Sequence, residues 1–411
     1  MKILLINPDL VNPPIAPVGL EYVTEHLKKK GHDVNLVDLA IEPQVEYLGN
    51  FDLIGIGIRN IDNTGFSPVV FYLPEVRELI ETIRNNSQAP IVIGGAAVNL
   101  MPDEIREYVG ADYAVVGKGF DSIDSLVESF DKSVQIKPVI EVTGDAVVGY
   151  FQRDVLSHEP YAKEGTSIGI ATKFGCPFNC SYCDYPIGDG VGLRERSIDE
   201  VIYEAERLYN RGVYNMFFAD ANFNISAEHG TTILKELNRS KIKISWGAFL
   251  NPHPLAFTDD FFKGLLKSGK QRVSLGVDSL SARTLFNLNK PFTMQDIERA
   301  TSMCQSAGVL VNYSILFGHP DEAQEDVLET FANIDRLKPD YADIVMGIRL
   351  FPKTPLYSEC LRNGIIPPEL SLLEPYYITP SQKVRETILE ETARRPNCHF
   401  SNPLSLKMYR D

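Results

Sequence analysis

The chain has 411 residues, of which 44% are hydrophobic and 23% are charged, an ordinary globular balance with room for two or three domains. Its formal net charge is −15, the reverse of the basic excess that phosphate neutralisation favours in nucleic-acid binders. No run of about 20 apolar residues predicts a membrane span, and the apolar start is too short for a signal peptide. We therefore expect a cytoplasmic enzyme with a small-molecule substrate, and neither nucleic acid nor a membrane as a partner.

The first 145 residues alternate between strand-like and helix-like patterns. Helices are predicted at 19–30 and 73–85, and strands at 2–7, 33–38, 52–58, 90–94 and 113–116. Helix-sized segments between strands predict a doubly wound parallel sheet with right-handed crossovers. Such sheets bind ligands beyond the carboxyl ends of their strands, where this sequence places Gly94-Gly95 and Gly117-Lys118-Gly119. These glycines either admit a ligand close to the backbone or only make tight turns.

A linker is expected at 146–165, and the alternation restarts after it. Strands are predicted at 167–172, 214–219, 243–249, 272–276, 309–316 and 343–349. Helices are predicted at 198–212, 228–239, 259–268, 293–307 and 323–337. Six strand–helix units in succession predict a partial (β/α)6 barrel over 166–370, with its site at the carboxyl-terminal mouth. Residues 371–411 are expected to form a less regular C-terminal extension.

Three of the six cysteines, Cys176, Cys180 and Cys183, lie within eight residues, on the loop directly after the first predicted barrel strand. Thiolates are the usual ligands of iron–sulfur clusters. Three ligands on a [4Fe–4S] cluster leave one iron open, and an open iron can chelate the amino and carboxylate groups of S-adenosylmethionine (SAM). The alternatives are structural zinc, which normally takes four ligands, and three buried structural cysteines. Neither Cys304, expected in a helix, nor Cys398, expected in an irregular tail, is predicted to be a ligand.

The spacing Cys176-x-x-x-Cys180-x-x-Cys183, with an aromatic Tyr182 before the last cysteine, resembles the signature of the radical SAM superfamily. Segments after the later strands also match. The resemblance implies that Tyr182 belongs to the cofactor site and that Asp220, Asp278 and Ser314 contact SAM; the alternative for these three is helix capping or turn formation. Arg349, at the end of the last predicted barrel strand, is the candidate catalytic residue. It either binds a carboxylate or makes an ion pair with an acidic residue.

A doubly wound domain before such a barrel resembles the cobalamin-binding subgroup of this family, and the similarity runs from residue 1 to about 380. It implies that cobalamin contacts Gly94, Gly95, Gly117 and Gly119. The chain lacks the Asp-x-His-x-x-Gly motif that supplies a histidine to cobalt, and its nearby histidines, His26 and His32, flank a helix on the other side. Cobalamin is therefore expected base-off, without a histidine ligand.

The lower face of the corrin is expected against the loop that begins with Arg59 and Asn60. Arg59 either places a cation there, deterring a sixth ligand, or pairs with Asp62 or another loop carboxylate.

Three functions are compatible with these patterns. The first is a cobalamin-dependent methyltransferase that passes a methyl group from SAM through cobalt to a small molecule. The second is a radical SAM enzyme with a non-methylating outcome such as cyclisation, ring contraction or oxidation, since a fold does not fix the reaction. The third is a non-catalytic iron–sulfur electron carrier or sensor. Both enzymes would need an external electron donor such as flavodoxin or ferredoxin.

Overall fold

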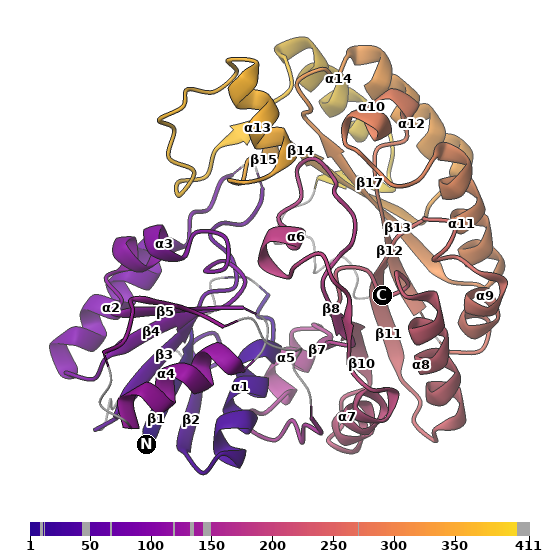
Figure 1. Cartoon of the computed structure of the whole chain (residues 1–411). Helices are drawn as coiled ribbons and strands as arrows, with labels where there is room; N and C mark the ends of the chain where they lie inside the picture. The colour runs from indigo at the N-terminus through magenta and orange to yellow at the C-terminus, as the bar shows by residue number, and fades with distance from the viewer. Residues whose placement is uncertain are drawn as a thin grey trace.

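The chain forms two halves, each built on a parallel sheet, in a computed structural model (Figure 1). It describes residues 1–8, 11, 13–42, 50–65, 68–117, 120–131, 135–142, 149–269 and 271–400. Gly119, one of the predicted cobalamin contacts, lies outside these residues. Among the described residues, no helix has the length and apolar character that crossing a bilayer requires.

The first half is a six-stranded parallel sheet in the order β2-β1-β3-β4-β5-β6. Its strands are β1 (Lys2–Asn7), β2 (Asp33–Asp38), β3 (Leu53–Gly57), β4 (Ile91–Gly94), β5 (Tyr113–Val116) and β6 (Val139–Glu141). Its helices are α1 (Val18–Lys29), α2 (Leu73–Asn86), α3 (Pro102–Val109) and α4 (Asp121–Asp131). The doubly wound fold is confirmed, and the order reverses between β1 and β3. Ligands of such sheets bind at this reversal, next to the end of β3.

The second half is a curved parallel sheet in the order β17-β14-β13-β12-β11-β10-β7. Its strands are β7 (Ile168–Ile170), β10 (Asn215–Phe218), β11 (Ser245–Leu250), β12 (Gln271–Asp278), β13 (Leu310–Phe317), β14 (Tyr341–Met346) and β17 (Cys398–Phe400). Around it lie α7 (Ile198–Asn210), α8 (Ala227–Arg239), α9 (Asp259–Leu265), α10 (Ala282–Asn287), α11 (Met294–Ser306), α12 (Gln324–Leu337) and α14 (Gln382–Ala393). The partial barrel is therefore confirmed.

The tail is more regular than expected. Strand β17 pairs in parallel with β14, so the placement of Cys398 in an irregular tail was wrong. Three residues are too short a segment for its alternation to be read in the sequence, and the neighbouring strand decides its conformation. Cys304 lies in α11, as predicted, and is fully buried.

Alternation along the barrel strands separates a helix-facing side from a concave side. On β13, Val311, Tyr313, Ile315 and Phe317 are fully buried in the apolar core shared with the outer helices. Asn312 and Ser314 lie between them and are only half-buried. Because successive side chains of a strand point to opposite faces, Asn312 and Ser314 face the concave side of the barrel.

A buried network of charges joins the two halves through the segment predicted as a linker. Arg153, fully buried, lies 2.5 Å from both Glu21 of α1 and Glu204 of α7. His158 Nε2 lies 2.9 Å from Glu21, and Arg196 donates to Glu204 at 2.7 Å. The short helix α5 (Glu159–Lys163) follows. This segment therefore fixes the relative position of the halves, because its charges are satisfied only when α1 and α7 approach each other.

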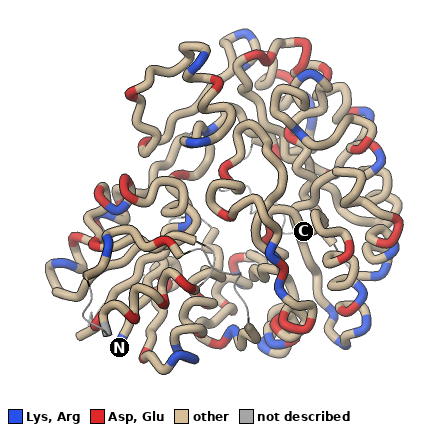
Figure 2. The backbone as a smooth tube through the Cα atoms, viewed as in Figure 1, with Lys and Arg blue, Asp and Glu red and all other residues tan. Residues whose placement is uncertain are grey.

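Opposite charges intermingle over the backbone of both halves in the view of Figure 2. The excess of Asp and Glu over Lys and Arg is thus spread over both halves in this view.

Candidate functional site

The three clustered cysteines lie on a long loop closed by a short hairpin, β8 (Lys173–Phe174) and β9 (Arg194–Glu195). Gly175 opens the loop with φ +89°, and a Cβ there would stand 2.1 Å from the carbonyl oxygen of Gly192. Only glycine fits such a position. The amide of Cys176 donates to the carbonyl of Gly190 at 3.0 Å, which closes the loop behind the cysteines.

All three cysteines carry free thiols, and Cys176 and Cys180 are 6% and 9% exposed. Burial raises the pKa of each thiol, while the positive charge of Lys290 opposes the rise at Cys176 and Cys180. Thiols must lose their protons to ligate iron, and a buried cation beside them favours the thiolate. Three free thiols on one loop, two of them beside a buried cation, fit an anionic iron–sulfur cluster. Among the described residues, no three His, Cys, Asp or Glu side chains are grouped around a single-ion position.

Lys290 belongs to a buried trio that sequence reasoning missed. Its ammonium pairs with Asp278, and the Tyr182 hydroxyl donates to the same carboxylate. Burial lowers the pKa of Lys290, but Asp278 outweighs this effect, so the pKa lies above its ordinary value and the side chain stays charged. Asp278 has φ +59°, an uncommon conformation for a residue other than glycine. The trio joins two predicted site residues to the cysteines, and only the fold brings Lys290 to them.

Backbone hydrogen bonds attach the cysteine loop to the barrel. Ser181 donates its amide to the carbonyl of Leu288 at 2.9 Å, and its own carbonyl accepts from the amide of Leu356 at 2.7 Å. Leu356 lies in α13 (Pro355–Arg362), which follows the last barrel strand. The loop is therefore held from both sides rather than only at its ends.

Asp220 and Ser314 lie in different surroundings. Asp220, 2% exposed, accepts from the amide and hydroxyl of Thr172 and from the Lys173 ammonium at 2.7 Å. These partners lie 48 and 47 residues earlier in the chain, so the contacts are neither the helix capping nor the turn formation offered as the alternative. The hydroxyl of Ser314 lies 3.1 Å from that of Ser274 on the concave side of the barrel. Contact of either residue with SAM stays a prediction.

The glycines at the carboxyl edge of the first sheet form tight turns. Gly95 has φ +114°, and a Cβ there would stand 2.5 Å from the carbonyl oxygen of Ile58. Gly117 has φ +120°, and Gly94 packs against Val115. Gly95 and Gly117 are exposed, so the backbone just beyond β4 and β5 is open to solvent, which fits a bulky planar ligand.

One side chain joins this edge to the cysteine loop. Asn99, which follows Gly94-Gly95, accepts from the Gly117 amide at 3.0 Å and donates to the Gly188 carbonyl at 3.0 Å. Gly188 ends α6 (Tyr185–Gly188), the short helix after Cys183, which lies between the two halves (Figure 1). The glycine turns and the cysteine loop are therefore neighbours.

Arg59 and Asn60 lie on the loop after β3. Arg59 is exposed, and no ion pair joins it to any described residue. Asn60 is half-buried. The proposed pairing of Arg59 with Asp62 is not found.

Asp62 pairs instead with Arg349, the predicted catalytic residue, at 2.7 Å. Arg349 is 5% exposed, and it also donates to the carbonyls of Leu350 and Leu372 at 2.6 and 2.9 Å. The structure thus shows the ion pair that the sequence left open as the alternative. A catalytic role of Arg349 stays a prediction that these contacts do not support.

The two histidines of the first half have partners away from the glycine turns. His26 stacks on Phe120 and lies 2.9 Å from Asp124 Oδ1, and His32 lies 3.4 Å from the N-terminal amine. These contacts fit the expectation that neither histidine is a ligand of cobalt.

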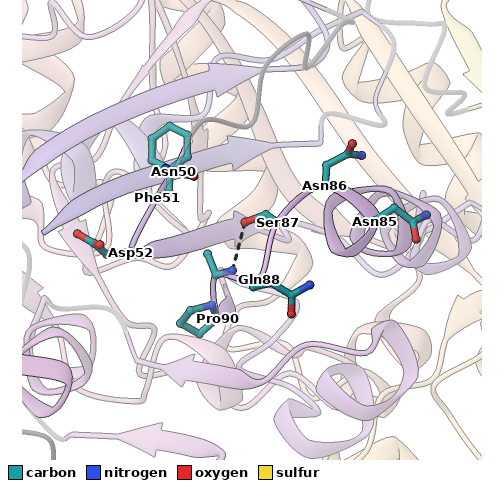
Figure 3. A pocket seen from close by; sticks show the side chains of 9 residues that line it. Asn50, Phe51, Asp52, Asn85, Asn86, Ser87, Gln88 and Pro90 are labelled. Carbon is teal, nitrogen blue, oxygen red and sulfur yellow. Dashed lines mark hydrogen bonds between the residues drawn. The ribbon is translucent and has the colours of Figure 1, made fainter.

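A surface hollow of about 660 Å³ lies elsewhere in the first half (Figure 3). It is lined by Asn50–Asp52 and residues 85–90, which precede β3 and β4. It therefore lies at the amino ends of these strands, opposite the glycine turns, and takes no part in the site.

Two family models match the chain. The radical SAM superfamily matches residues 170–334, and the B12 binding domain matches residues 9–127. The first match covers the cysteine loop and most of the barrel, and the second covers the first sheet and its glycine turns.

The chain is also similar over most of its length to other proteins. Tryptophan 2-C-methyltransferase of Streptomyces laurentii is 23% identical over 85% of this chain and 73% of its own length. An uncharacterized methyltransferase of Pyrococcus horikoshii is 25% identical over 89% and 84%.

Among solved structures, the radical SAM methyltransferase TsrM of Kitasatospora setae with tryptophan and a SAM analogue bound is 26% identical, with a TM-score of 0.81 over 88% of this chain and 76% of its own. The same enzyme with cobalamin and a [4Fe–4S] cluster gives a TM-score of 0.88 at 23% identity, over 100% and 96%. Both domain models, in the same order and with the cysteine loop facing the glycine turns, place this chain in the family of cobalamin-binding radical SAM enzymes.

Proposed function

We propose that the protein is a cobalamin-dependent methyltransferase that moves a methyl group from SAM to a small molecule. When bound, cobalamin would accept a methyl group from one SAM, which leaves S-adenosylhomocysteine, and would pass it on, while the cluster would supply an electron that cleaves a second SAM to methionine and a 5′-deoxyadenosyl radical. The proposed location is the cytoplasm, with an external donor such as flavodoxin or ferredoxin supplying the electron.

The observation that carries this proposal is the contact between the two half-sites. The loop of Cys176, Cys180 and Cys183 reaches the edge of the first sheet through α6, where Asn99 bonds both Gly117 and Gly188. A cluster and a corrin held at these two places would share one enclosed space, as a transfer between SAM and cobalt requires. An electron carrier has no use for such an arrangement.

The chain's own residues have defined parts in this proposal. The three thiolates hold the cluster, while Lys290 supplies a cation beside them and Asp278 keeps that cation in place. Arg59, exposed on the loop after β3, lies under the corrin and deters a ligand on its lower face. The buried charges around Arg153 hold the halves together, which excludes water from the space between them.

The test uses SAM that carries a deuterated methyl group, so the acceptor need not be known. Anaerobically purified protein with cluster and cobalamin is mixed with this SAM and a reductant. The proposal expects S-adenosylhomocysteine to form and the deuterium to appear in the corrinoid fraction. Formation of 5′-deoxyadenosine with no methyl transfer would contradict it and favour a non-methylating radical enzyme. Intact SAM throughout would favour an electron carrier or sensor.

A further inference from the structure

Asn99 occupies the junction between the two half-sites and is itself rigidly placed. It lies in the turn after β4, where the amide of Ala97 donates to Ile58 at 3.2 Å and the amide of Val98 donates to Gly95 at 3.1 Å. Its neighbours Val98 and Leu100 are 0% and 6% exposed. The turn is thus part of the core of the first half, and Asn99 cannot move without it.

The orientation of the Asn99 amide follows from its partners. The Gly117 amide can only donate, so it faces Oδ1, and the Gly188 carbonyl can only accept, so it faces Nδ2. Both distances are 3.0 Å, and Asn99 is 7% exposed. The side chain therefore uses both ends, one on each half of the molecule.

Gly188 lies close to the turn that carries Asn99. A Cβ on Gly188 would lie 3.9 Å from Asn99 Cβ and 4.0 Å from both the Ala96 carbonyl oxygen and Leu100 Cδ2. Helix α6 thus rests directly on the turn that follows Gly94-Gly95. Cys183 lies two residues before α6, so the position of the helix sets the position of the last cysteine relative to the first sheet.

We propose that Asn99 is a positioning residue that fixes the cysteine loop against the carboxyl edge of the first sheet and so sets the spacing between the two cofactors. This inference rests on the proposed function in that both cofactors bind where stated. A short, planar amide that is hydrogen-bonded at both ends fixes the distance between the cysteine loop and the first sheet. A longer side chain, or one bonded at a single end, would not fix this distance.

The decisive variant is Asn99→Asp, which keeps an acceptor for Gly117 and replaces the donor to Gly188 with an oxygen that repels the carbonyl. Asn99→Ala removes both bonds. Asn86→Asp is the matched control, because Asn86 Nδ2 also donates to a carbonyl, that of Thr82 at 2.8 Å, but on the exposed face of α2. The distance between cob(II)alamin and the reduced cluster is measured by pulsed electron paramagnetic resonance on the holoenzyme.

We expect wild type and Asn86→Asp to give the same narrow distance distribution, and both Asn99 variants to give a broader or shifted one with iron and corrinoid at wild-type amounts. A wild-type distribution in Asn99→Asp would overturn the proposal. A merely structural residue would lower stability without moving this distance.

If a variant or the wild type retains no cobalamin, the role of Asn99 is tested instead by hydrogen exchange on the cluster-loaded protein. Loss of the bond to Gly188 is expected to speed exchange in α6 on the order of tenfold in Asn99→Asp, with the barrel strands unchanged. Exchange in α6 equal to that of Asn86→Asp would overturn the proposal. Wild-type protein without bound cobalamin would contradict the proposed function, whereas this exchange result concerns Asn99 alone.

Discussion

Arg349 Nε lies 2.7 Å from Asp62 Oδ2, and the two side chains are 3% and 0% exposed. The pair joins the end of the barrel, in β15 (Ile348–Arg349), to the loop that carries Arg59. The hydroxyl of Tyr377, in β16 (Tyr377–Ile378), donates to the other Asp62 oxygen at 3.1 Å, and β16 pairs with β15. The loop after β3 is therefore held by residues from the other end of the chain.

Asp62→Asn is expected to destabilise the protein by about 3–5 kcal/mol, because it leaves the Arg349 guanidinium buried without its counter-ion. Tyr377→Phe, which removes one hydrogen bond, is expected to cost about 1 kcal/mol. Urea unfolding at neutral pH measures both. Unchanged stability in Asp62→Asn would show that the pair does not hold the loop.

Replacing Cys176, Cys180 and Cys183 together with alanine is expected to abolish bound iron and SAM cleavage, because no other described cysteine lies on their loop. Cys304→Ser serves as the control. It alters a fully buried thiol in α11 and should reduce stability but not iron content. Iron at wild-type stoichiometry in the triple variant, or its loss in the control, would refute the assignment of the ligands.

Acid stability should depend on Glu21. Burial raises its pKa, but Arg153 and His158 outweigh burial and lower it to about 2, below the ordinary value of about 4.5. The folded protein thus binds fewer protons here than the unfolded chain, and the stabilisation is complete above about pH 4.5 and lost as the pH falls towards 2. Glu21→Gln should be less stable at neutral pH and lose less stability between pH 4.5 and pH 2.

The control for this experiment is Glu81→Gln, which changes an exposed carboxylate 3.9 Å from Arg77 on α2. Unfolding free energies across the acid range measure the slope for each variant. Equal slopes in Glu21→Gln and wild type would contradict a depressed pKa for Glu21.

Replacing Arg59 is expected to change the spectrum of bound cobalamin and to leave the stability of the protein almost unchanged. Arg59→Ala should change the unfolding free energy by no more than about 0.5 kcal/mol, because the side chain is exposed and makes no ion pair with a described residue. It should alter the absorption spectrum of bound cobalamin, because the lower face loses the cation that deters a ligand. A spectrum identical to that of the wild-type holoenzyme would remove Arg59 from the site.

The sequence predicts the elements that have strong periodicity and the ligands that have fixed spacing. Strands β1, β2 and β5 begin and end at the predicted residues, and the cysteine loop lies where the alternation places it. The contacts that assemble the site could not be predicted in this way, because they join residues far apart in the sequence. Asp62 with Arg349, and Asn99 with Gly188, are separated by 287 and 89 residues. No local pattern encodes a partner at such a distance.

The role of Lys290 could not be predicted from the sequence either. It lies 12 residues beyond Asp278, after α10, and nothing in its neighbourhood distinguishes it from a surface lysine. Helices α3 and α4 and strand β6 also escaped prediction, since they are short or follow glycine turns whose local signals dominate.

We propose that one chain holds a cluster and a cobalamin at the facing edges of its two halves. The most direct measurement is the absorption spectrum and metal content of anaerobically reconstituted protein after incubation with hydroxocobalamin and desalting. We expect one [4Fe–4S] cluster and one corrinoid to be retained per chain, with the corrinoid base-off. A protein that keeps its cluster but retains no corrinoid would contradict it.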